Sequence, residues 1–463
     1  MNILIAPNSM KGSLNARDFA DIACKAFRSV SPLFNVRTAP VADGGDYTGE
    51  ILIDAMGARR FTAEVNDPLN RPITCGFGVA GDTAVIEMAS ASGLKLIPDT
   101  ERNPEITSSF GTGQLMKRAF ELGCSRVLLG AGGSATVDGG IGILDGLGFE
   151  FLDFNGQKLP GLASSLQNVA EIRYPQPVLA EHEILILCDV NNPLLGENGA
   201  ASVFGPQKGA TPEMVKRLEN GLENWVTLIE KLTGKEIRSL PGSGAAGGIA
   251  CGLSLLKNTK LIKGSEFVFD MIGLEEKLQW ADLVLTGEGR LDSQSLSDKA
   301  PYALSVRAEQ AGIPVIALAG SYEYRVAGSF DAVFSILNEP VTTGFAMQNA
   351  GTLVFQGASQ IARFLLATRQ DLSAGNEILK EIQTALRGNQ VIKAMELLGK
   401  LNSDSAAYWY YLGMVLKKEQ KWGEAMNAFL KSLEIDASHE QARAGLEMTR
   451  SILSFTNPHL LDP

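Results

Sequence analysis

The stretch Arg126–Gly148 combines residue types that suit the binding of an anion. Its apolar run Val127–Leu129 predicts a short buried strand, and helical spacing begins at Ile141 after an intervening loop. Glycines allow backbone N–H groups to turn toward a ligand, and the start of a helix adds positive potential. The candidates for holding nucleotide phosphates are therefore Gly130, Gly132, Gly133, Ser134, Ala135 and Thr136. The alternative is a tight strand–helix turn that holds no ligand.

Acidic residues beside glycine, serine or threonine recur where predicted strands end. They are Asp43, Asp138, Asp189, Glu288 and Asp292. Ligands of open α/β sheets bind beyond the carboxyl ends of the strands, so this shared placement favours one common site. A single acid of this kind is more often a loop cap. We assign Asp43, Asp138 and Glu288 to a metal, and Asp189 or Asp292 to the acceptor hydroxyl or its metal.

Phosphoryl transfer requires groups of these kinds. It uses backbone donors for nucleotide phosphates, a carboxylate for Mg²⁺, a base for the acceptor hydroxyl and a cation near the transferred charge. Lys11 follows the predicted strand Asn2–Ala6 in the loop P-N-S-M-K-G-S-L and is the candidate catalytic cation, with Ser9 beside it. A lysine in a loop is also commonly just solvated.

Composition limits the class of protein. The chain has 463 residues, 45% of them apolar and 20% charged, which is typical of a soluble protein with two or three domains. A net charge of -11 argues against nucleic-acid and anionic-membrane partners, and no apolar run is long enough to span a membrane. The five separated cysteines and the absence of a secretory-signal pattern favour a cytoplasmic location.

The elements that must position these residues alternate between strands and helices. Strands are predicted at Asn2–Ala6, Val36–Val41, Ile184–Leu187, Leu283–Leu285, Val315–Leu318 and Ala332–Ile336. A strand–loop–helix order of this kind is the unit of a parallel α/β sheet. From Arg60 to Met88 the pattern changes to alternating segments joined by turns, which predicts antiparallel hairpins and the start of a second domain.

Three common nucleotide or hydrolase motifs are absent or weak. The sequence contains no G-x-x-x-x-G-K-[ST] phosphate loop and no G-x-S-x-G elbow. The letters of Gly242–Gly247 match the dinucleotide fingerprint G-x-G-x-x-G, but the residues before them are a poor strand. An NAD-dependent oxidoreductase is therefore a weak third hypothesis.

Composition shifts beyond Gly375, where glycine loops give way to Leu, Ala, Lys and Glu. Ala406–His439 has the 34-residue length of a tetratricopeptide (TPR) unit. The positions typical of that repeat are filled by Trp409, Leu412, Gly413, Ala425 and Phe429. A weaker copy precedes it, so a TPR-like helical domain is predicted at residues 376–463. Because stacked repeats need neighbours, this tail should dock on the α/β part, on a second subunit or on a protein partner. An ordinary helical hairpin is the alternative.

A series of motifs resembles the bacterial glycerate kinase family of the glyoxylate and glycerate pathway type. In chain order these are I-A-P-N-S-M-K-G-S-L, V-A-D-G-G, F-G-T-G-Q-L, G-G-S-A-T-V-D-G-G, C-D-V-N-N-P-L, F-G-P-Q-K-G-A-T, P-G-S-G-A-A-G-G and T-G-E-G-R-L-D-S-Q-S. The similarity runs from Met1 to about Leu366, nearly the whole α/β part. Eight motifs in the same order make the resemblance specific.

This resemblance implies an activity and a fold. The family phosphorylates D-glycerate with ATP and Mg²⁺. The resemblance also implies two α/β domains. Residues 1–60 and 270–372 would form a flavodoxin-like parallel-sheet domain, and residues 61–269 would form an inserted mixed α/β domain of restriction-endonuclease-like fold. Because both substrates are anions, Lys11, Arg71 and Arg290 are the candidate cations for glycerate and phosphates, although Arg71 stands in a predicted turn.

Four positions depart from the family's usual pattern. Asn8 stands where Asp is usual, Gln114 where Glu is usual, Val137 where Asn is usual, and Asp298 where Gly is usual. Since the acids and cations named above are present, we expect an active enzyme, with 2-phosphoglycerate slightly favoured over 3-phosphoglycerate as product. The alternative is a catalytically weakened nucleotide-binding scaffold whose helical tail recruits a partner.

Overall fold

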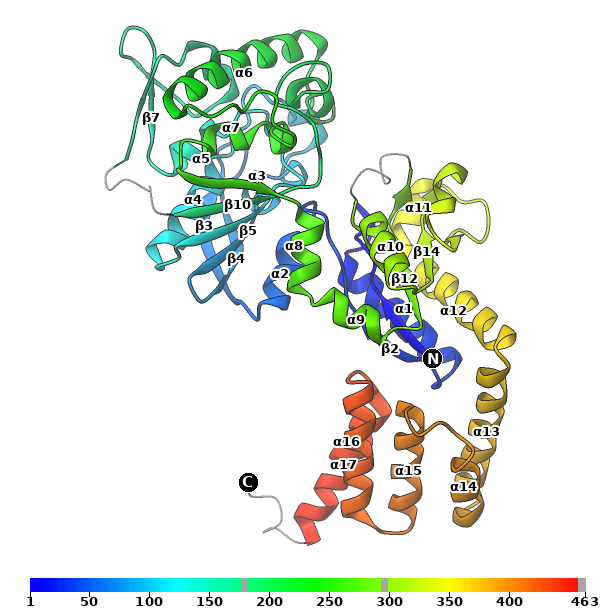
Figure 1. Cartoon of the computed structure of the whole chain (residues 1–463). Helices are drawn as coiled ribbons and strands as arrows, with labels where there is room; N and C mark the ends of the chain where they lie inside the picture. The colour runs from blue at the N-terminus through cyan, green and yellow to red at the C-terminus, as the bar shows by residue number, and fades with distance from the viewer. Residues whose placement is uncertain (176–181, 293–298, 457–463) are drawn as a thin grey trace. The chain divides into compact units, whose positions relative to one another are not determined.

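The computed structural model describes residues 1–175, 182–292 and 299–456 of the chain (Figure 1). These residues form two compact units. Unit 1 contains Met1–Pro40, Glu276–Leu291 and the chain from Ser305 onward, and unit 2 contains Val41–Glu275 with Asp292–Leu304. Among the described residues, no helix is long and apolar enough to cross a membrane.

Unit 1 is built on a parallel five-stranded sheet. Its strands, in chain order, are β1 (Asn2–Ile5), β2 (Asn35–Thr38), β12 (Leu283–Thr286), β14 (Val315–Ala319) and β16 (Ala332–Ser335). Across the sheet they follow the order β16-β14-β12-β1-β2, which is 2-1-3-4-5 when the five strands are renumbered and read from the β2 edge. This is a common order of doubly wound α/β sheets, and it confirms the predicted parallel α/β class.

Helices accompany this sheet. They are α1 (Ala16–Val30), α9 (Leu274–Trp280), α10 (Ala300–Gln310), α11 (Thr343–Gln348) and α12 (Ala350–Thr368). Of these, α1 and α12 pack on its strands because their buried apolar residues recur at helical spacing. The side chain of Asn15 caps α1 by accepting a hydrogen bond from the N–H of Asp18 at 2.7 Å. Phe19 and Phe27 of α1 are fully buried. The short strands β13 (Arg290–Leu291) and β15 (Ser321–Tyr322) pair beside the main sheet.

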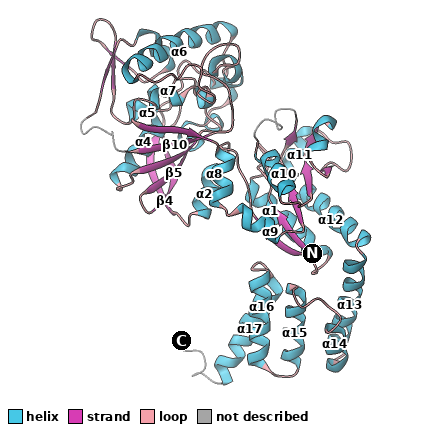
Figure 2. Cartoon of the chain, in the orientation of Figure 1, coloured by secondary structure: helices cyan, strands magenta, loops and turns pink. Residues whose placement is uncertain are grey.

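Unit 2 contains a mixed six-stranded sheet. Its strands are β3 (Arg59–Asn66), β4 (Pro72–Ala80), β5 (Thr83–Glu87), β6 (Arg126–Gly130), β10 (Glu183–Leu187) and β11 (Asn258–Ile262). The order is β11-β10-β6-β5-β4-β3, in which the first four strands are parallel and β4 and β3 are antiparallel additions (Figure 2). The predicted hairpins between Arg60 and Met88 are therefore present, but β5 joins the parallel part.

Two long helices and several short ones surround this sheet. They are α2 (Thr48–Ala55), α3 (Met88–Ser92), α4 (Phe110–Glu121), α5 (Ile141–Gly146), α6 (Pro212–Thr233), α7 (Ile249–Leu253) and α8 (Gly264–Met271). Thr211 caps α6, as its sequence position predicts, by accepting from the N–H of Met214 at 3.3 Å. The indole of Trp225 donates to the carbonyl of Gly139 at 3.0 Å, which ties α6 to the loop before α5. A small antiparallel sheet holds β7 (Glu150–Leu152), β8 (Lys158–Leu159) and β9 (Glu171–Arg173).

The glycine-rich run Gly242–Gly247 does not open a dinucleotide-binding helix. Turns, not a strand, precede it, and its last three residues, Ala245–Gly247, form a 3₁₀ turn before the five-residue helix α7. Its glycines serve close packing instead, since a Cβ at Gly247 would lie 2.1 Å from the carbonyl oxygen of Thr136. The third hypothesis, an NAD-dependent oxidoreductase, loses its only support.

The tail described beyond α12 consists of helices and their connections (Figure 2). The helices are α13 (Gln370–Arg387), α14 (Val391–Leu398), α15 (Ala406–Lys418), α16 (Trp422–Ile435) and α17 (Glu440–Thr456). Phe429 of α16 is fully buried, and Cβ atoms at Gly413 and Gly445 would lie 2.6 and 2.8 Å from its ring. The two small residues therefore allow α15 and α17 to approach α16 closely.

The tail belongs to unit 1 and shares its core. One apolar cluster includes Leu33 and Phe34 after α1 together with Leu379 and Ile382 of α13. Polar contacts accompany it: the Arg28 guanidinium binds the carboxylate of Asp436, which is 3% exposed. The sequence predicts the TPR-like domain at residues 376–463, and the helical tail of the structure begins slightly earlier, with α13 at Gln370.

The boundary between the units also differs in place from the predicted one. Unit 2 begins at Val41, not at residue 61, because α2 packs on β4, β5 and α8 of unit 2. The segment that carries Asp43 therefore belongs with the six-stranded sheet. At the other end the division falls at Glu275, close to the predicted residue 269.

Candidate active site

The register of unit 2 brings four strand ends to one edge. Glu87 of β5 pairs with Gly130 of β6, Gly130 with Leu187 of β10, and Leu187 with Ile262 of β11. Because these strands are parallel, the loops that leave their carboxyl ends start side by side. The edge defined by these four residues is the candidate active site of unit 2.

The loop after β6, Gly130–Thr136, is held tightly at its base. The N–H of Gly132 donates to the carbonyl of Gly44 at 2.9 Å, and a Cβ at Gly132 would lie 2.3 Å from the carbonyl carbon of Gly45. Gly133 has a φ of +69°, which favours glycine. The loop residues predicted as a nucleotide site therefore lie at the candidate edge, next to the loop that carries Asp43.

Two successive backbone N–H groups of this loop are open. The N–H groups of Ala131, Gly132 and Ala135 all donate to carbonyls of neighbouring segments. Within the described residues, the N–H groups of Gly133 and Ser134 donate to no protein atom. Adjacent free N–H groups on a glycine loop form a concave donor pair of the kind that binds phosphate or carboxylate oxygens.

The loop Val41–Asp46 crosses the same edge. Gly44 has a φ of +82°, and its Cβ would lie 2.5 Å from the carbonyl oxygen of Leu187, so only glycine permits this approach. Asp43 accepts from the N–H of Gly45 at 3.1 Å. These contacts place Asp43 beside the end of β10.

Asp189, two residues after β10, has a carboxylate oxygen without a protein partner. Its Oδ2 accepts from the N–H of Ser265 at 2.9 Å, whereas the buried Oδ1 has no hydrogen bond among the described residues. Burial raises the pKa of Asp189 to about 7; hydrogen bonds from Ser265 oppose this, and the charge of Asp43 adds to it. A carboxylate in this state suits a proton acceptor or a cation ligand.

Glu87 is a further acid at the edge that the sequence reasoning missed. Its Oε1 accepts from the N–H of Tyr47 at 2.5 Å, and this contact supports the positive φ of Tyr47. Burial raises the pKa of Glu87 to about 7, against the hydrogen bond from Tyr47. Lys95 binds Asp46 at 2.7 Å nearby. The signal was available, because Glu87 is the last residue of the apolar strand β5.

Asp138 lies in the interior. Its side chain is 0% exposed. Its Oδ2 accepts from the N–H and hydroxyl of Ser109 at 2.8 and 2.6 Å, and its Oδ1 accepts from the N–H of Gly140 at 3.1 Å. Burial raises its pKa, and these hydrogen bonds oppose the shift. This position favours a role in holding the loop over the predicted binding of a metal.

The predicted residues of unit 1 lie at the carboxyl ends of β1 and β12. The N–H of Asn8 donates to the carbonyl of Gly287 at 2.8 Å, and a Cβ at Gly289 would lie 3.5 Å from the backbone nitrogen of Lys11. Ser9 and Lys11 therefore share a loop cluster with Glu288, which is 6% exposed. Arg290 follows, with its side chain 66% exposed and 3.6 Å from Glu323.

Arg71 stands apart from these clusters. Arg71 lies in the β3–β4 turn, where its guanidinium binds Asp67 at 2.6 Å and Glu101 at 3.0 Å. These ion pairs favour a role in shaping the turn. Asp292 borders the undescribed residues 293–298 and is half-buried.

The departures from the family pattern are accommodated within the fold. Asn8 is buried, and its Oδ1 accepts from the N–H of Ser9 at 2.7 Å. Gln114 accepts from the N–H of Asn66 at 2.7 Å, which joins α4 to β3. Val137 is fully buried in the apolar core of unit 2. Asp298 lies outside the described residues.

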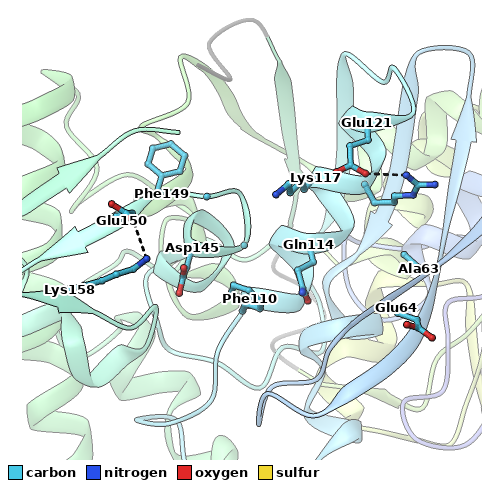
Figure 3. Close-up of a pocket in the computed structure, with 13 residues that line it drawn as sticks. Ala63, Glu64, Phe110, Gln114, Lys117, Glu121, Asp145, Phe149, Glu150 and Lys158 are labelled. Atoms are coloured by element: carbon cyan, nitrogen blue, oxygen red, sulfur yellow. Dashed lines mark hydrogen bonds and ion pairs between the residues drawn. The ribbon is translucent and has the colours of Figure 1, made fainter. Parts of the chain in front are cut away.

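A separate pocket of about 730 Å³ opens between α4, α5 and the small sheet of unit 2 (Figure 3). None of the predicted site residues lines it. Its charged side chains largely neutralise one another, as in the pairs Lys158–Glu150 at 3.0 Å and Arg118–Glu121 at 3.0 Å. The chemistry of the pocket gives no reason to move the candidate active site there.

A metal site built from the protein alone is not present among the described residues. No three His, Cys, Asp or Glu side chains of that part converge. Mg²⁺ is commonly held by one or two carboxylates together with substrate phosphates and water, and needs no such cage. Asp43 and Asp189, which are close enough for the charge of Asp43 to raise the pKa of Asp189, fit that mode of binding.

The comparisons with known proteins match this architecture. The model of the glycerate kinase family covers residues 3–366. The glycerate kinase of Halalkalibacterium halodurans is 42% identical over 368 residues, 78% of this chain and 97% of the relative. The glycerate 2-kinase of Escherichia coli K12 is 39% identical over 373 residues, 79% of this chain and 98% of the relative.

A solved structure agrees with these relatives. A crystal structure of a candidate glycerate kinase 2 from Salmonella typhimurium LT2 superposes with a TM-score of 0.68 at 39% identity, covering 80% of this chain and 99% of that one. The fold and the edge of clustered acids and glycines thus define an α/β enzyme of the kinase class. The chain belongs to the glycerate kinase family.

Proposed function

We propose that this protein is a cytoplasmic, ATP-dependent glycerate kinase that transfers a phosphoryl group to D-glycerate. The observation that carries the proposal is the 42% identity to a glycerate kinase across nearly all of that relative's length. The name of the Escherichia coli relative, glycerate 2-kinase, favours 2-phosphoglycerate as the product.

The chemistry assigned to unit 2 follows from its open groups. The N–H groups of Gly133 and Ser134 would bind phosphate oxygens of ATP, and Asp43 with Asp189 would hold Mg²⁺. When bound, Mg²⁺ neutralises charge that builds up on the transferred group. Oδ1 of Asp189, which has no hydrogen bond from any residue that the structure describes, also suits acceptance of the proton from the glycerate hydroxyl. Base and metal ligand are therefore both proposed roles for this carboxylate.

We also assign each unit and the tail to a type of domain. We assign the sheet of unit 1 to the flavodoxin-like domain, on the basis of its strand order, and that of unit 2 to the inserted restriction-endonuclease-like domain. The pairing of α15 with α16 around Gly413 supports a TPR-like assignment of the tail.

The activity is tested by following ADP release after D-glycerate is added to the full chain with ATP and Mg²⁺. Release that depends on glycerate supports a kinase, whereas ATP binding without turnover would favour the scaffold alternative. Phosphorus NMR of the product distinguishes 2-phosphoglycerate from 3-phosphoglycerate. A product phosphorylated only at the 3-hydroxyl would contradict the proposed regiospecificity.

Replacing Gly133 by valine should raise the KM for ATP strongly or abolish ATP binding. The residue has a φ of +69°, and a Cβ there would lie 2.5 Å from Oδ1 of Asp46 and 3.0 Å from Cβ of Ala89. A branched side chain would therefore displace the loop that offers the two N–H groups. ATP titration and steady-state kinetics measure the effect. Unchanged ATP kinetics in a folded variant would move the phosphate site to another loop.

Methionine at Lys11, Arg71 or Arg290 should raise the KM for glycerate or ATP wherever the natural residue binds a substrate. Methionine keeps much of the side-chain length and removes the charge. Arg71, already bound by Asp67 and Glu101, is expected to change least and serves as the internal comparison. If all three variants keep both wild-type KM values, the cations for the substrates lie elsewhere.

A further inference from the structure

Lys208 is a buried lysine directly behind the loop Gly130–Thr136. It ends the short turn Pro206–Lys208 and is only 3% exposed. Its Nζ donates to the hydroxyl oxygen of Ser134 at 2.9 Å and to the carbonyl of Thr136 at 2.6 Å. Burying a charged group is costly unless it is well bonded, so these contacts specify one position for the ammonium.

The direction of these hydrogen bonds fixes the role of the Ser134 hydroxyl. An ammonium group has three donors and no acceptor, so Ser134 Oγ must accept from Lys208. The hydroxyl hydrogen of Ser134 is then left to be donated elsewhere. Within the described part of the chain it donates to no protein atom, and neither does the N–H of the same residue.

We propose that Lys208 is a positioning residue that turns the Ser134 hydroxyl into a third donor for a phosphate of ATP. The proposal rests on the proposed function, in which the N–H groups of Gly133 and Ser134 bind that phosphate. Three donors on two successive residues match the three acceptor oxygens of a terminal phosphate. The ammonium behind the loop adds positive charge without touching the nucleotide.

A purely structural role makes a different prediction. The charge of Lys208 also favours the ionised form of Asp138, so its loss could simply loosen the interior of unit 2. In that case the effect would not depend on the Ser134 hydroxyl. A double-mutant cycle separates the two roles, because residues that act through one another have non-additive effects.

The experiment compares Ser134→Ala, Lys208→Met and the double variant in the full chain. Equilibrium binding of ATP, the KM for ATP and kcat are measured for each. A hydrogen bond to a charged group corresponds to about 10- to 100-fold in affinity. We expect both single variants to lose about that much ATP affinity, and the double variant to be no weaker than Lys208→Met. The KM for glycerate should change little.

Lys235→Met is the matched control, since Lys235 also donates to a backbone carbonyl of unit 2, that of Ser254 at 2.9 Å, outside the site. It should keep wild-type ATP affinity. Strictly additive losses in the cycle overturn the role of Lys208, while the loop remains the nucleotide site. If Lys208→Met does not fold, Ser134→Ala alone still tests the proposal. Suppose that Ser134→Ala keeps wild-type ATP affinity while Gly133→Val lowers it: the loop is then the nucleotide site, but the Ser134 hydroxyl is not a donor, and the proposal is overturned. If neither variant lowers ATP affinity, the loop is not the nucleotide site.

Discussion

Replacing Asp189 by asparagine should lower kcat by about 10²–10⁴-fold, the usual contribution of a general base. Asparagine keeps the shape of the side chain and removes its charge and its ability to take a proton. Asp189 Oδ1 is buried without a hydrogen-bond partner in the described part of the chain, and the carboxylate stands beside Asp43 at the end of β10. Steady-state release of ADP with D-glycerate measures the loss.

Asp145→Asn is the control for this prediction. Asp145 is another partly buried carboxylate of unit 2, whose Oδ2 accepts from the N–H of Gly161 at 3.0 Å, but it lines the separate pocket of Figure 3. Its variant should keep a near-wild-type kcat. If Asp189→Asn and Asp292→Asn both keep near-wild-type kcat, the base lies elsewhere, and Asp43 is the next residue to replace.

Strand-end acids could be found from the sequence because the carboxyl ends of parallel strands share one edge. That rule locates Asp189 after β10. Asp43 follows β2 of the other sheet, and it lies near Asp189 because its loop crosses the end of β10. The rule misses Glu87 because the pattern of its strand predicts a hairpin. The structure pairs β5 antiparallel with β4 on one side and parallel with β6 on the other, and the second pairing places Glu87 at the edge.

Contacts between distant segments could not be found in this way. Asp138 has the same local pattern as Asp43, yet the hydroxyl of Ser109, 29 residues away, helps to keep it in the interior. Lys208 lies 74 residues from Ser134, and neither its burial nor its hydrogen bonds follow from the motif F-G-P-Q-K-G-A-T. Local pattern gives the residue types at a loop, whereas tertiary packing decides which of them face a ligand.

The helical tail is a second case in which the sequence pattern does not give the tertiary contacts. The change in composition near Gly375 marks a helical tail that should dock elsewhere, but it does not give where the tail begins or what it covers. In the structure α13 starts at Gln370 and shares an apolar cluster with Leu33 and Phe34 after α1. A Cβ at Gly375 would lie 3.0 Å from Cδ1 of Leu33. The relatives match this chain over 97–99% of their own length but only 78–79% of its length.

Removing the whole tail should leave kcat largely unchanged and lower stability markedly. A cut after Gly375 would fall inside α13, so the chain should end at Thr368, where α12 ends. Every predicted site residue precedes this point. The cut uncovers Leu33 and Phe34, which are 8% and 2% exposed in the full chain. Full burial of such a side chain is worth about 1.5–3 kcal/mol.

The exposed surface also borders β2, an edge strand of unit 1, where Asn35 accepts from the N–H of Ala406 at 3.2 Å. An uncovered sheet edge with apolar neighbours promotes association between copies. We therefore expect the shortened chain to melt at a lower temperature and to self-associate in light scattering, with kcat close to that of the full chain.

Asp436→Asn, which weakens the ion pair with Arg28 and keeps every helix, should show a smaller loss of stability in the same direction. Complete loss of activity in a folded, monomeric shortened chain would show instead that the tail shapes the active site.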